Sequence, residues 1–122
     1  MNTLAILLPA PIGFHLFIRW PRDRLRRSST LVQACDLADV LRSTGHPLVV
    51  GLVGTRHAEV VAEEVLDFAE LVSIPEAWLR RVPRGDVRAR AEAAARIVSA
   101  HRKGPVLHYL PYEYQNQEAL PF

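Results

Sequence analysis

Apolar residues along the chain gather in short runs that are separated by segments of helical periodicity. Bulky apolar residues at 3–8 and 14–18 predict two strands, because the residues between them include two prolines and a glycine and indicate a turn. One bent strand is the alternative. The run at 48–53 is almost entirely aliphatic, which is typical of a strand covered on both faces by helices. A further apolar run predicts a last strand at 106–110.

Three longer segments have the 3.6-residue period of amphipathic helices. The first is predicted to begin at Ser28 or Ser29 and to end at Gly45, and the third covers 86–102. The second begins at Thr55 and has Val61, Val65, Phe68 and Val72 on its core face. Ser73 and Glu76 have the spacing of a capping box for an additional short helix. The expected core consists of the inward-facing apolar residues Leu4, Ile6, Leu8, Phe14, Leu16, Leu31, Cys35, Leu41, Val49, Leu52, Val61, Val65, Phe68, Val98, Val106 and Leu110.

The predicted element order is strand, strand, helix, strand, helices, strand. Two links in this order are strand–helix–strand crossovers, which require parallel neighbours in one sheet. The sequence therefore predicts an α/β fold, a three-layer sandwich around a small mixed, mostly parallel sheet. We expect a single domain over 1–122, in which residues 111–122 form a polar and aromatic tail.

Charge is distributed in blocks, although the formal net charge of the 122 residues is only +2. Five arginines accompany one aspartate at 19–27, six acidic residues accompany one arginine at 56–76, and eight basic residues accompany two acidic ones at 80–103. Such blocks can pair inside the fold or dock a protein partner. The basic run at 19–27 also suits a phosphodiester backbone, but the rest of the chain is net negative, so nucleic acid is not the expected partner.

Cys35 is the only cysteine, which excludes an intrachain disulfide and a cysteine-based zinc site. The longest apolar run is far shorter than the roughly 20 residues that a membrane span needs. No basic segment precedes that run, so a signal peptide is not expected. These features predict a cytoplasmic protein without membrane attachment.

Candidate chemistry is expected beyond the carboxyl ends of the strands, where open parallel sheets place their ligand crevices. Residues 19–22, 54–57 and 111–114 each follow a predicted strand and together contain arginines, aromatic rings and a helix N-terminus. This inventory suits a phosphate and a planar ring. The candidate ligand-binding residues are Trp20, Arg22, Thr55, Arg56, His57 and Tyr112.

His57 is the candidate for a catalytic role, because the first turn of a helix favours a neutral imidazole. The plainer alternative is that Gly54 forms a turn, Thr55 caps a helix and His57 is a surface residue. Neither of the standard glycine-rich nucleotide motifs is present, and no metal site or cofactor is predicted. Whether the protein is an enzyme stays open.

The passage 37–50, with Leu37-Ala38 and Gly45-His46 before an aliphatic strand, resembles the helix-to-strand passage in the N-terminal half of glycosyltransferases of the GT-B fold. The passage 100–111, with Gly104-Pro105, is similar to a later strand in that half. The resemblance implies a chain that binds the acceptor or acts with a partner subunit.

The leading functional hypothesis is binding of a phosphate-bearing small molecule, either a nucleotide or a sugar phosphate, with Arg22 and Arg56 on the phosphate and Trp20 or Tyr112 on the ring. The alternatives are a non-catalytic protein-interaction module and the acceptor-binding part of a split glycosyltransferase. A small sheet with exposed edge strands also favours a homodimer.

Overall fold

The computed structural model describes residues 3–21, 23–54 and 56–103, and its centre is a five-stranded sheet in the order β3-β2-β1-β4-β5. The central strand β1 is parallel to β4 and antiparallel to β2, β4 is parallel to β5, and β2 is antiparallel to β3. All strands except β2 therefore run in the same direction, which confirms the predicted mixed, mostly parallel sheet. The strands are β1 (Thr3–Pro9), β2 (Phe14–Arg19), β3 (Arg26–Val32), β4 (Leu48–Val53) and β5 (Glu70–Ile74).

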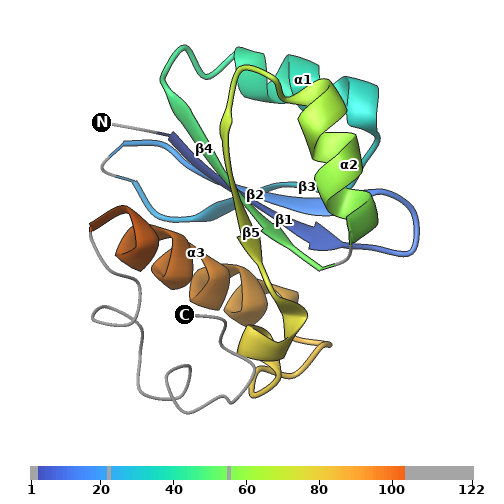
Figure 1. Cartoon of the computed structure of the whole chain (residues 1–122), viewed down its shortest axis with the longest axis vertical. Helices are drawn as coiled ribbons and strands as arrows, with labels where there is room; N and C mark the ends of the chain where they lie inside the picture. The colour runs from blue at the N-terminus through green and yellow to red at the C-terminus, as the bar shows by residue number, and fades with distance from the viewer. Residues whose placement is uncertain (1–2, 22, 55, 104–122) are drawn as a thin grey trace.

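Helices cover both faces of this sheet (Figure 1). One face carries α1 (Ala34–Arg42) and α2 (Arg56–Val65), and the other carries the short 3-10 helix η1 (Glu76–Leu79) and the long helix α3 (Val87–Lys103). Asp86 caps α3, because its Oδ1 accepts a hydrogen bond from the backbone N–H of Ala89 at 3.0 Å. The predicted three-layer α/β sandwich is thus confirmed.

The two cores follow from the alternation of side chains along the strands. In β1, Leu4, Ile6 and Leu8 pack on the side of α3, and Ala5 and Leu7 pack on the side of α1 and α2. Both sets are buried because β1 is the central strand. The glycine at position 51 in β4 leaves room for α3, since a Cβ there would lie 2.7 Å from Cγ2 of Val98.

The predicted helix start at Ser28 or Ser29 is wrong. Residues 26–32 form the edge strand β3, and α1 begins only at Ala34. The open edge of β2 offers unpaired backbone groups, and pairing with β3 satisfies them. Leu31 is consequently 52% exposed rather than part of the core. Arg26 and Arg27, at the end of the basic run, belong to the backbone of this edge strand, and Arg26 is exposed.

The predicted second helix is too long, because its last part belongs to a strand in the structure. The helix α2 ends at Val65, and after a turn the chain forms β5, in which Val72 and Ile74 are buried. Phe68 lies in that turn and is 40% exposed, so its placement in the core is wrong. Its ring lies 5.0 Å below the guanidinium carbon of Arg42, a cation–π contact at the end of α1.

The remaining core predictions divide by position. Val61 and Val65 are partly buried against the core under α2. The predicted strand at 106–110, with Val106 and Leu110, lies outside the described residues, as does the tail at 111–122. The residues confirmed as buried are Leu4, Ile6, Leu8, Phe14, Leu16, Leu41, Val49, Leu52 and Val98.

Cys35 is exposed in the first turn of α1, and its predicted burial is wrong. The buried positions of this helix are Leu37, Ala38 and Leu41, and Cys35 lies outside the face that these three residues form. We expect the native protein to react with a thiol-specific reagent nearly as fast as the unfolded protein does. Protection of this thiol under native conditions, followed by a colorimetric thiol assay, would contradict the exposed position.

Candidate functional site

The carboxyl ends of β1 and β4 form a switch point in the chain. These strands are parallel neighbours, but the chain leaves β1 towards β2 on one side and leaves β4 towards β5 on the other. Open α/β sheets place their ligand crevices at such points, because diverging connections leave a gap there. The topology therefore marks this end of β1 and β4 as the place to search for a site.

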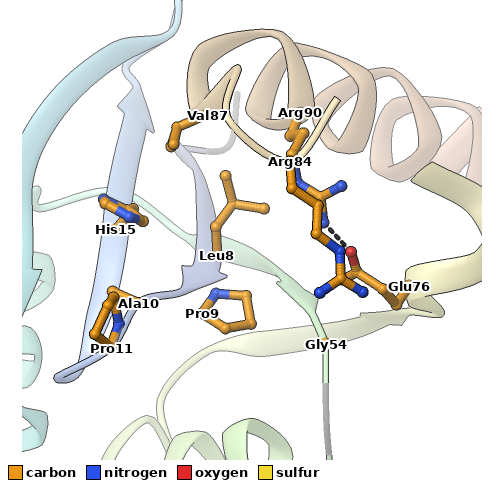
Figure 2. Close-up of a pocket in the computed structure, with 10 residues that line it drawn as sticks. All are labelled: Leu8, Pro9, Ala10, Pro11, His15, Gly54, Glu76, Arg84, Val87 and Arg90. Carbon is orange, nitrogen blue, oxygen red and sulfur yellow. Dashed lines mark hydrogen bonds and ion pairs between the residues drawn. The ribbon is translucent and has the colours of Figure 1, made fainter. Parts of the chain in front are cut away.

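A pocket of about 640 Å³ lies at this switch point (Figure 2). Its apolar wall comes from the end of β1 and the following turn, with Val87 of α3 opposite them. Its polar side chains come from β2, η1 and the region around the start of α3. The lining residues are Leu8, Pro9, Ala10, Pro11, His15, Gly54, Glu76, Arg84, Val87 and Arg90.

Gly54 lines the pocket and lies close to Pro9. Its φ is +120°, and a Cβ at this position would lie 2.5 Å from Cγ of Pro9. Its backbone N–H points to the carbonyl oxygen of Ile74 at 3.5 Å. The glycine is thus explained by a tight approach of two strand ends.

Arg90 and Glu76 form the most buried charged contact of the pocket. The side chain of Arg90 is 8% exposed, its Nη2 donates to Oε1 of Glu76, and its Nη1 donates to the carbonyl oxygen of Val82 at 3.4 Å. The ion pair joins η1 to α3 beside the pocket, as the dashed line in Figure 2 shows. The charge of Arg90 is therefore balanced within the protein.

Arg84 supplies the excess positive charge of the pocket. It is exposed in the turn before α3, next to Arg90 and Glu76 in Figure 2. Among the described residues, no carboxylate forms an ion pair with Arg84. Two guanidinium groups and one carboxylate thus line the same hollow, which favours an anionic ligand.

His15 adds an imidazole to the wall of the pocket. It lies on β2 directly opposite Leu8 of β1, and its side chain is half-buried on the face that carries α3. An imidazole nitrogen can donate or accept a hydrogen bond at the border between the apolar and charged walls.

The residues predicted for ligand binding do not all meet at this edge. β2 runs antiparallel to β1, and Arg19 at its end pairs with Leu4 at the start of β1. Trp20 therefore lies near the amino end of β1, away from the carboxyl ends of β1 and β4. The expectation that it joins residues 54–57 is wrong.

Arg56 and His57 lie at the predicted edge, in the first turn of α2 directly after the switch point, but their side chains are outside the described part of the structure. Arg22, Thr55 and Tyr112 are also outside the described residues. Their predicted roles, including the catalytic role of His57, stay predictions.

Arg84 and Arg90 were missed as site residues because the parallel strand that precedes them, β5, was predicted as part of a helix, and His15 was missed because it lies within a strand. The sequence holds a local signal for two of these residues: Arg84 stands between Pro83 and Gly85 in a turn, and His15 interrupts an apolar strand. Arg84 precedes α3 and Arg90 lies in its first turn, so only the packing of α3 on the sheet brings these arginines to the end of β1.

Within the described ranges, no group of three or more His, Cys, Asp or Glu side chains is arranged to hold a metal ion. No helix in the same ranges is long and apolar enough to cross a membrane. No protein-family model matches the chain, and comparisons with curated proteins and with solved structures find no match. The fold and the pocket define an α/β domain with a cation-lined hollow at the switch point of a mixed five-stranded sheet.

Proposed function

We propose that the protein binds a phosphate-bearing small molecule, a nucleotide or a sugar phosphate, in the pocket at the carboxyl ends of β1 and β4. The observation that carries this proposal is the position of Arg84 beside a partly apolar pocket at the switch point. Its guanidinium is exposed and has no ion-pair partner among the described residues. The volume of about 640 Å³ falls within the range of roughly 300–1,000 Å³ that is usual for small-molecule sites.

The lining residues suggest how such a ligand lies. The planar fork of Arg84 matches two phosphate oxygens, and Arg90 adds a second guanidinium that Glu76 already orients. Pro9, Pro11 and Val87 provide an apolar surface for a ring or a sugar face. This assignment moves the phosphate from Arg22 and Arg56, where the sequence predicted it, to Arg84.

We expect a nucleotide or sugar phosphate from a thermal-shift screen to stabilise the protein, and Arg84→Gln to weaken its binding about tenfold, because one charge-assisted pair is lost. Isothermal titration measures the change. Arg96→Gln is the matched control, since Arg96 is an exposed arginine of α3 that does not line the pocket. Equal losses in both variants, or stabilisation that survives Arg84→Gln, would place the ligand elsewhere.

Acceptor binding in a split glycosyltransferase is a second candidate. It is supported by the passage 37–50, in which α1 ends before Gly45, whose φ is +67°, and β4 begins at Leu48, the order that the GT-B resemblance implies. An acceptor without phosphate would bind the wild-type protein and the Arg84→Gln variant equally well. The same titration therefore separates the two candidates, and a screen without any small-molecule hit favours a protein-interaction module.

A further inference from the structure

A second, smaller hollow of about 310 Å³ adjoins the proposed site. It shares Glu76, Arg84 and Arg90 with the larger pocket, so the two hollows meet at these three charged side chains. Its other lining residues come from η1 and the following loop, and they include Arg80. A ligand held at Arg84 can therefore extend from the larger hollow into the smaller one.

Arg80 makes the smaller hollow more positive than the larger one. It is exposed at the end of η1, and among the described residues no carboxylate forms an ion pair with it. Arg80, Arg84 and Arg90 line the smaller hollow together with the carboxylate of Glu76. Because Glu76 neutralises Arg90, two uncompensated guanidinium groups remain, one shared by both hollows and one confined to the smaller hollow.

We infer that the ligand carries two phosphate groups, with one phosphate at Arg84 between the hollows and the second at Arg80 in the smaller hollow. This inference rests on the proposed function and deepens it, since it names a bisphosphate or diphosphate rather than a monophosphate. The apolar part of the molecule then occupies the larger hollow, against Pro9, Pro11 and Val87. Each guanidinium can bind one phosphate group through two N–H···O bonds, so two guanidinium groups can hold two phosphates.

The test compares probes that differ by one phosphate: inorganic phosphate with pyrophosphate, and adenosine monophosphate with adenosine diphosphate. We expect the second phosphate to raise the affinity of the wild-type protein about tenfold in isothermal titration, and Arg80→Gln to reduce that gain below about twofold. Arg84→Gln weakens both members of each pair, because its guanidinium holds the first phosphate. The matched control is Arg81→Gln, since Arg81 is the adjacent exposed arginine and lines neither hollow; it should keep the tenfold gain.

Two results would overturn the inference and leave the proposed function intact: equal affinities of the wild-type protein for the two members of each pair, or an equal loss of the gain in Arg80→Gln and Arg81→Gln. The latter result would assign the gain to the general positive field. If no phosphate compound binds the wild-type protein at all, the proposed function fails and the inference fails with it. The thermal unfolding midpoint of each variant without ligand checks that it is folded.

Discussion

Replacing Glu76 by Gln is expected to lower the free energy of unfolding by about 3 kcal/mol, because the change leaves the guanidinium of Arg90 buried without a countercharge. Removing the other partner by Arg90→Met is expected to lower the free energy of unfolding by about half as much. The side chain of Glu76 is 35% exposed, so water hydrates the carboxylate that remains, whereas that of Arg90 is only 8% exposed. Urea denaturation of the two single variants measures both values.

The control for this asymmetry is an exposed pair on the same helix. Nη2 of Arg88 lies 3.6 Å from Oε1 of Glu92, and the two side chains are 55% and 44% exposed. Glu92→Gln should therefore change the free energy of unfolding by less than about 0.5 kcal/mol. The double variant Glu76→Gln with Arg90→Met should cost less than the sum of the single changes, since each one alone leaves an unpaired group. A larger cost for Arg90→Met than for Glu76→Gln would refute the argument from burial.

Replacing Gly13 by Ala is the second change for which we expect a large effect, a loss of about 3 kcal/mol in the free energy of unfolding. Gly13 has a φ of +79° in the turn between β1 and β2, and a Cβ there would lie 2.5 Å from the carbonyl oxygen of Val32. That oxygen belongs to the backbone at the end of β3, so the contact can be relieved only by moving the strand or the turn. Chemical denaturation measures the loss.

Gly45 is the matched control for the backbone strain alone. Its φ of +67° is similar, but nothing lies within 4 Å of the position that a Cβ would occupy. Gly45→Ala should cost only about 1 kcal/mol, the ordinary penalty of a left-handed conformation. The difference between the two variants measures the clash with β3. Equal losses would mean that the turn adjusts freely and that β3 does not constrain it.

Local pattern was sufficient to predict the elements with strong periodicity. The apolar runs at 3–8 and 48–53 became the adjacent strands β1 and β4, and the segment predicted as a helix at 86–102 corresponds to α3 (Val87–Lys103). Local pattern failed where one spacing fits two structures. Helical spacing links Val61, Val65, Phe68 and Val72, yet Val72 belongs to β5. The strand β5 forms because it pairs with β4, and this pairing cannot be inferred from local spacing.

The location of the candidate site was predictable, but most of its side chains were not. Strand–helix–strand order alone indicates that the carboxyl edge of the sheet carries the crevice, and the pocket lies there. The antiparallel direction of β2 removed Trp20 from that edge, and the path of α3 brought Arg84 and Arg90 to it. Neither the direction of a strand nor the partner of a helix is encoded in the spacing of neighbouring residues.

The sequence by itself determined which segments can bury an apolar face, because that property depends on the period of side chains within one element. The α/β class follows from the order of those segments. Only the tertiary structure decided that residues 26–32 pair with β2 and that Glu76 neutralises Arg90 while Arg84 remains exposed beside the pocket. These features depend on contacts between segments distant in the chain or joined by a turn, and the free energy that selects them comes from backbone pairing and burial in the complete fold.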